Sequence, residues 1–363
     1  MSKENPSSRL QSRSVQEKEK QSGNEHRAPN LVVLQELITR CSALPQLSGQ
    51  TYADSSRGSR RSANQDVVRA SELFSHFLSE FGFQTQDRFF TSIVLGAEYA
   101  ASVGKDRTLY PPVAYVLRAM RQMHALESTR PGAVHYLCET QGIRNFARFS
   151  LEFWERQYDE RNDTNPYMVI VVPSELSEPF ITETLVYEEL QDKLAALKTP
   201  HDMRIVEVDG LLEFFRAFVR LNKTYNAHQQ NPIQLVLYDG HGLSHRIYLG
   251  ETNFGVQQLM NNRFDALFKK RFSSVFSKRA TFILASCYAA GIKKTEVDSV
   301  GVALKRKLSE LLGEKIRVIA TPDEATPFLN LTPTLKKNGA LRLSIDSYPS
   351  DANKEGEPRY TKL

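Results

Sequence analysis

Apolar residues recur at helical spacing in the first half of the chain. Side chains three and four positions apart form apolar stripes of the kind that amphipathic helices bury. Glycine and proline residues fall between the stripes, where helices begin or end. The five stripes are LVVLQELITRC (31–41), VVRASELFSHFLSEFG (67–82), RFFTSIVLGAEYAASVG (88–104), VAYVLRAMRQMHAL (113–126) and NFARFSLEFWERQY (145–158). This pattern predicts an all-α domain over residues 30–160.

In the second half of the chain, short apolar runs alternate with helical stretches. The runs are YMVIVV (167–172), RIVEV (204–208), QLVLY (234–238), ATFILASC (280–287) and KIRVIATP (315–322). Helical stretches are predicted over 184–197, 211–225, 254–276 and 295–312, with a small hairpin around RIYLG (246–250). Such alternation is typical of βαβ units and of a sheet covered on both faces. We therefore predict an α/β domain over residues 165–350 with a mostly parallel sheet flanked by helices.

The two ends of the chain are polar. Residues 1–29 are rich in Ser, Gln, Glu, Lys and Arg and have few large apolar side chains, so we predict a disordered tail. A sharper alternative is an unstructured export signal of the kind found on effector proteins that bacteria inject into host cells. Residues 351–363 are expected to form a flexible C-terminus.

Composition narrows the class of protein. Of the 363 residues, 40% are hydrophobic and 25% are charged, and no apolar run approaches the roughly 20 residues of a membrane span. The formal charge of +5 comes from Lys and Arg interspersed with Asp and Glu, so no nucleic-acid partner is expected. The three cysteines are widely spaced, so they match neither a set of structural disulfides nor a C-x-x-C metal-binding motif. We expect a soluble protein of a reducing cytosol, with no cofactor and no metal.

Two of the predicted strands end in reactive side chains. His241 lies at the end of one strand, in YDGHG, and Cys287 lies at the end of the other, in FILASC. Functional groups of open α/β sheets collect beyond the carboxyl ends of the strands. An imidazole that accepts the proton of a thiol makes it a nucleophile at neutral pH. The amides of Gly242 and Cys287 could donate to an oxyanion formed during acyl transfer.

The pair YDGHG and FILASC, with a helix between them and the histidine first, resembles the caspase-like (clan CD) cysteine peptidases. Caspases, metacaspases, legumain, gingipains, separase and the inositol-phosphate-activated protease domains of bacterial toxins form this group. The resemblance covers about residues 166–347. It implies that His241 is the general base, that Cys287 is the nucleophile, and that Gly242 and Cys287 supply the oxyanion amides.

A second similarity concerns IRVIATPDEATPF (316–328), which is similar to the strand and loop that follow the cysteine in metacaspases and legumain. That resemblance implies that Asp323 or Glu324 lines the specificity pocket and favours a basic side chain before the cleaved bond. The alternative is that both carboxylates are simply solvated. The chain departs from caspases and metacaspases at Ala285 and Ser286, so caspase-type Asp specificity is not implied.

Three further features have two interpretations each. Asp239 could orient His241, or serve only in the turn. His245 is either a rival base or an exposed loop residue. The basic clusters at 269–271, 278–279, 293–294 and 305–307 are either outer faces of helices or, as in the toxin proteases, a site for an anionic or inositol-phosphate activator.

The sequence thus favours a cysteine endopeptidase that hydrolyses a protein substrate through a Cys287–His241 dyad, in the manner of an effector acting in host cytosol. The alternative is a caspase-like pseudo-peptidase that serves as a protein-interaction module. A third hypothesis is autoprocessing, with a cut either in the polar loop predicted over residues 48–66 or in the 159–165 linker, which would release the peptidase domain.

Overall fold

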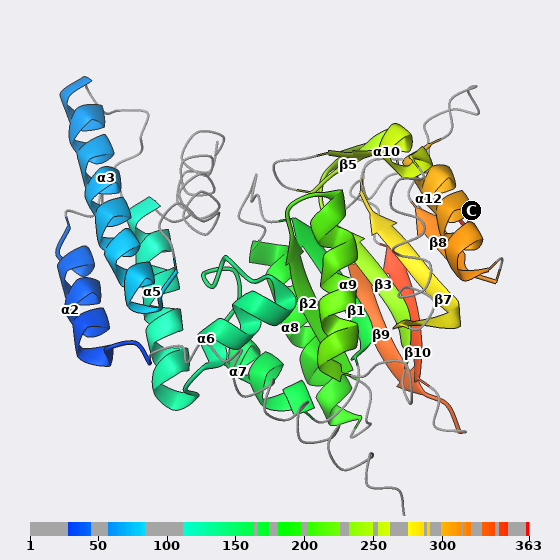
Figure 1. Cartoon of the computed structure of the whole chain (residues 1–363), viewed down its shortest axis with the longest axis horizontal. Helices are drawn as coiled ribbons and strands as arrows, with labels where there is room; N and C mark the ends of the chain where they lie inside the picture. The colour runs from blue at the N-terminus through cyan, green and yellow to red at the C-terminus, as the bar shows by residue number, and fades with distance from the viewer. Residues whose placement is uncertain are drawn as a thin grey trace, which may run out of the picture.

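The structure is a computed structural model, and it describes residues 28–44, 57–83, 112–162, 166–173, 181–197, 202–225, 232–249, 253–261, 275–286, 289–290, 299–313, 315–320, 329–337, 341–347 and 361–362. The predicted tail up to residue 27, the helix predicted at 88–104 and most of the predicted C-terminus lie outside these ranges. The described part is an α/β structure preceded by helices, which agrees with the fold class predicted from the sequence (Figure 1).

The N-terminal region consists of helices. Its elements are α2 (Leu31–Ser42), α3 (Arg57–Glu80), α5 (Pro112–Thr129), α6 (Ala133–Tyr136), the π-helical turn η1 (Leu137–Gln141), α7 (Leu151–Asp159) and the 3₁₀ turn η2 (Glu160–Asn162). The helix predicted from residue 145 begins only at Leu151, because the side chain of Ser150 accepts the Phe153 N–H at 3.2 Å and caps it.

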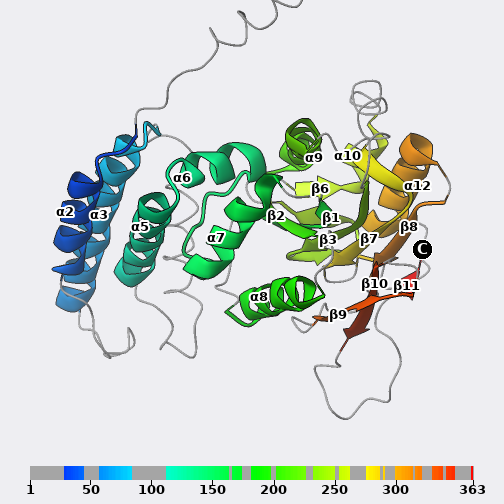
Figure 2. The same ribbon diagram turned by 90° about the horizontal axis from the view of Figure 1, so that it is seen from below.

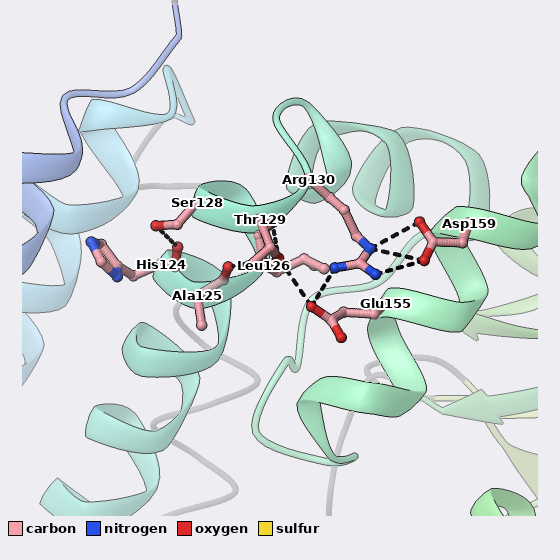
Figure 3. A network of polar contacts seen from close by, with 8 residues as sticks. All are labelled: His124, Ala125, Leu126, Ser128, Thr129, Arg130, Glu155 and Asp159. Atoms are coloured by element: carbon pink, nitrogen blue, oxygen red, sulfur yellow. Dashed lines mark hydrogen bonds and ion pairs between the residues drawn. The ribbon is translucent and has the colours of Figure 1, made fainter.

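Polar contacts join α5 to α7 (Figure 3). The Arg130 guanidinium donates to Asp159 at 2.8–2.9 Å and to Glu155 at 2.5 Å, and Thr129 also donates to Glu155, at 3.0 Å. A planar guanidinium that meets two carboxylates holds the two helices in a defined relative orientation.

Strands and helices alternate from residue 166 onward. The order is β1 (Pro166–Pro173), α8 (Ile181–Ala196), β2 (Asp202–Val208), α9 (Leu211–Tyr225), β3 (Ile233–Asp239), β4 (Gly242–Leu243), β5 (Arg246–Tyr248), β6 (Asn253–Gly255), α10 (Val256–Met260), β7 (Phe276–Ala285), α12 (Val300–Leu312), β8 (Arg317–Ala320), β9 (Leu329–Leu335), β10 (Leu341–Ser347) and β11 (Thr361–Lys362). The long helix predicted over 254–276 is wrong at both ends, since Phe254 lies in β6 and Phe276 begins β7.

The main sheet has the order β11-β8-β7-β3-β1-β2. All pairs from β8 to β2 are parallel, and β11 alone is antiparallel. Side chains on one face of the sheet pack with α8 and the N-terminal helices, whereas those on the other pack with α9, α10 and α12 (Figure 2). Both faces are therefore buried, as expected for a parallel sheet. Strands β4, β5 and β6 form a separate three-stranded sheet, and β9 pairs with β10.

The N-terminal helices and the sheet share one hydrophobic core. A single buried cluster contains residues of α2, α3, α5 and α7 together with Ile170, Ile205 and Leu237 of the sheet. Polar contacts cross the same boundary, because Glu207 of β2 accepts the backbone N–H of Arg144 at 2.8 Å. The boundary predicted near residues 161–165 therefore marks a change of secondary structure within continuous packing. No helix in the described ranges is long and apolar enough to cross a membrane.

Candidate active site

Strands β3 and β7 end side by side. Asp239, the last residue of β3, pairs with Ala285, the last residue of β7, and the Gly240 N–H donates to the Ala285 carbonyl at 3.3 Å. His241 and Cys287 each follow this pair by two residues in the sequence. The fold thus brings His241 to the end of the strand that directly precedes Cys287, as the sequence predicted.

Cys287 itself lies outside the described residues, and so do Asp323 and Glu324. Their roles remain predictions. The other two cysteines, Cys41 and Cys138, are buried in the helical region, as predicted. Burial raises the pKa of Cys41 to about 11 and raises that of Cys138 further. Both thiols stay protonated at neutral pH and are poor nucleophiles.

Gly242, the residue after His241, packs against Ser286, the residue after β7. A Cβ atom built on Gly242 would lie 1.8 Å from Oγ of Ser286, so any side chain there would force Ser286 or the hairpin to move. Ser286 is fully buried, and its Oγ has no hydrogen-bond partner within the described structure. Packing against Ser286 therefore requires glycine after the histidine, a reason that the sequence did not reveal.

The side chain of Tyr238 contacts the backbone of the hairpin that carries His241. Its hydroxyl donates to the carbonyl of Tyr248 and lies 3.3 Å from that of His241. The Tyr248 N–H donates to the same His241 carbonyl at 3.0 Å. Burial and then the charge of Asp239 raise the pKa of Tyr238 well above its ordinary value, so the phenol stays a donor.

Gly240 leaves room for this arrangement. A Cβ atom there would lie 2.6 Å from the hydroxyl of Tyr238 and 3.0 Å from Cγ of Pro173. The two glycines beside His241 are thus each required by a buried side chain. The interpretation that they make room for a substrate is a separate hypothesis.

Asp239 receives a hydrogen bond from outside its strand. The hydroxyl of Tyr187 in α8 donates to its Oδ2 at 2.5 Å. Tyr187 is buried in the core on the α8 face of the sheet, so this bond fixes the carboxylate at the end of β3. The orienting role predicted for Asp239 stays a prediction, and Tyr187 becomes a candidate partner in it.

The hairpin of β4 and β5 carries His241 on its exposed face. His241 and Leu243 are exposed and Gly242 between them is buried, while Arg246 and Tyr248 are half-buried and Ile247 between them is buried. This alternation is the signature of a strand pair with one buried face. His245 lies at the exposed turn that joins the two strands, which fits a loop residue.

The basic cluster of α12 is partly engaged by protein groups. Lys305 donates to the carbonyl of Ile316, and Lys307 pairs with Glu310 at 3.7 Å. Lys278 and Arg279 are exposed at the start of β7, and clusters 269–271 and 293–294 lie outside the described residues. The structure describes no group of three or more His, Cys, Asp or Glu side chains that could hold a metal.

Comparisons with family models and curated proteins identify no family for the chain. No protein-family model matches the chain, and no curated protein sequence matches it significantly. The candidate site therefore depends on geometry and chemistry alone.

Proposed function

We propose that the protein is a caspase-like cysteine endopeptidase that hydrolyses a protein substrate with Cys287 as nucleophile and His241 as general base. The observation that carries the proposal is the pairing of Asp239 with Ala285, extended by the hydrogen bond from Gly240 to Ala285. Two parallel strands in this register present the residues that follow them at one edge of the sheet.

The reaction begins when the imidazole of His241 takes the thiol proton of Cys287. The thiolate attacks a peptide carbonyl, the tetrahedral intermediate collapses, and the imidazolium protonates the departing amine. Water, deprotonated by His241, then hydrolyses the thioester and regenerates the thiol. The cleaved peptide bond leaves one carboxylate and one amine.

The backbone direction of Gly242 supports its role as an oxyanion donor. The bond from the Tyr248 N–H to the His241 carbonyl makes these two residues a hydrogen-bonded pair. The next pair, Gly242 and Ile247, is therefore of the non-hydrogen-bonded kind, whose N–H groups point away from the partner strand. The Gly242 N–H is thus free of β5 and available to a substrate carbonyl.

The test is cleavage of a peptide library by the purified protein. Cys287→Ala and His241→Ala should each abolish cleavage, whereas His245→Ala, a change to another histidine of the same hairpin, should leave it intact. The preferred residue before the cut tests the proposed pocket role of Asp323 and Glu324. Cleavage that survives in Cys287→Ala would rule out the proposal.

A second candidate function is a pseudo-peptidase that acts as a protein-interaction module in host cytosol. The observation that favours it is the hydrophobic core that the N-terminal helices and the sheet share. Binding to a partner protein that persists in Cys287→Ala, together with no cleavage by the unmodified protein, would favour the module.

A further inference from the structure

Arg246 lies on the same face of the hairpin as His241. The pair Leu243–Arg246 follows the pair His241–Tyr248 along the two strands, so all four side chains share the exposed face. Side chains directly opposite each other in such a pair have Cβ atoms about 5 Å apart, and diagonal neighbours lie within reach of a long side chain. An arginine is therefore a diagonal neighbour of the candidate base.

The guanidinium is turned toward the histidine end of the hairpin. Its central carbon lies 5.2 Å from the centre of the Tyr248 ring, and Tyr248 is the residue directly opposite His241. An arginine stacked on an aromatic ring is held in one orientation with less loss of side-chain freedom on binding. The positive charge thus lies near the ring of the residue directly opposite His241.

No carboxylate of a described residue compensates this charge. Among the described residues, none forms an ion pair with Arg246, and its Nε is buried without a hydrogen-bond partner. Three other half-buried arginines, Arg130, Arg156 and Arg220, each pair with a carboxylate, as Arg220 does with Glu213 at 2.9 Å. A half-buried guanidinium that lacks such a partner is suited to a carboxylate brought by a ligand.

We propose that Arg246 and Tyr248 form a subsite that binds an acidic side chain of the substrate close to the cleaved bond. This inference depends on the proposed peptidase function and adds a substrate class to it: proteins with Asp or Glu near the cut. The subsite is separate from the pocket proposed for Asp323 and Glu324, so a basic residue before the cut and an acidic one at another position are compatible.

Two alkylating reagents of similar size test the charge directly. Both form an S–C bond to the Cys287 thiolate and release iodide, but iodoacetate is an anion and iodoacetamide is neutral. Arg246→Gln should lower the ratio of the two rates by about fivefold at low salt, the effect expected of one positive charge close to the bound anionic reagent. Arg246→Lys should retain most of the ratio. Arg279→Gln, an equal change of net charge at the opposite end of β7, should leave it unchanged.

A peptide library with amidated C-termini tests the substrate class, because only side chains can then supply a carboxylate. The unmodified protein should prefer Asp or Glu at one position near the cut, Arg246→Gln should lose that preference, and Arg246→Glu should favour Lys there. An unchanged reagent ratio and an unchanged peptide preference in Arg246→Gln would overturn the subsite. Failure of the peptidase proposal would give a different result from failure of the subsite, because iodoacetamide labelling of Cys287 would then not depend on His241.

Discussion

Gly242 and Ser286 face each other so closely that a methyl group on Gly242 would lie 1.8 Å from Oγ of Ser286. One of these residues follows the candidate base and the other precedes the candidate nucleophile. Their contact joins the ends of the two strands that lead to His241 and to Cys287 in the sequence.

The substitution Gly242→Ala should destabilise the fold by about 3 kcal/mol, because overpacking a buried contact forces the backbone to shift. Ser286→Gly in the same chain should restore part of that loss by removing the opposing hydroxyl. Urea unfolding of the two single variants and the double variant gives the coupling energy, which we expect to exceed about 1 kcal/mol. Additive effects would show that the two residues do not meet.

Removal of the Ser286 hydroxyl alone should cost little. No described residue bonds to this buried hydroxyl, and an unpaired buried hydroxyl carries a desolvation penalty of about 1–3 kcal/mol, so Ser286→Ala should unfold at the same or at a higher urea concentration. Ser299→Ala provides the contrast, since Ser299 caps α12 by accepting the Val302 N–H at 3.3 Å and its loss should cost about 1 kcal/mol. A larger loss for Ser286→Ala than for Ser299→Ala would mean that Ser286 has a partner.

Tyr238→Phe should loosen the backbone of His241 while the sheet stays folded. The phenol holds the carbonyls of His241 and Tyr248, and phenylalanine keeps the ring but not the donor. We expect faster hydrogen exchange at the Tyr248 amide by about tenfold and a changed pH profile of Cys287 alkylation. Tyr248→Phe is the matched control, because it removes a hydroxyl of the same hairpin and keeps both backbone partners. Equal hydrogen-exchange rates at the amide of residue 248 in the unmodified protein and in both variants would contradict the role of Tyr238.

Asp202 should make the free energy of unfolding depend on pH between about pH 4 and 7. Burial raises its pKa to about 7, against the lowering effect of the Arg204 guanidinium and with a further raising effect from Glu160. The unfolded chain releases this proton near pH 4, so between about pH 4 and 7 the folded protein holds a proton that the unfolded chain has lost. The free energy of unfolding should therefore fall as pH rises through this window.

The variant Asp202→Asn should flatten that pH dependence, because it removes the titrating group. Thermal unfolding between pH 4 and 8 measures it, with Asp192→Asn as a control at an exposed carboxylate. An unchanged slope in Asp202→Asn would exclude this residue as the source.

The sequence predicted the two strands that lead to His241 and Cys287, because apolar runs and their end points depend on local patterns. It could not predict that Ser286 meets Gly242, since that contact depends on the register between β3 and β7. Arg246 was missed as well, although the alternation of Arg, Ile and Tyr after a two-residue turn already indicated that it shares a face with His241. The helix predicted over 254–276 was wrong at both ends, because its apolar spacing also fits strand ends at Phe254 and Phe276.

The rate of Cys287 alkylation by iodoacetamide as a function of pH tests the central claim most directly. Mass spectrometry separates the Cys287 peptide from those of Cys41 and Cys138, which burial keeps unreactive. The account predicts that Cys287 reacts at pH 6 and that His241→Ala moves the midpoint up toward the ordinary thiol value of about 8.5. His245→Ala should leave the profile in place. A midpoint that is the same with and without His241 would contradict the dyad.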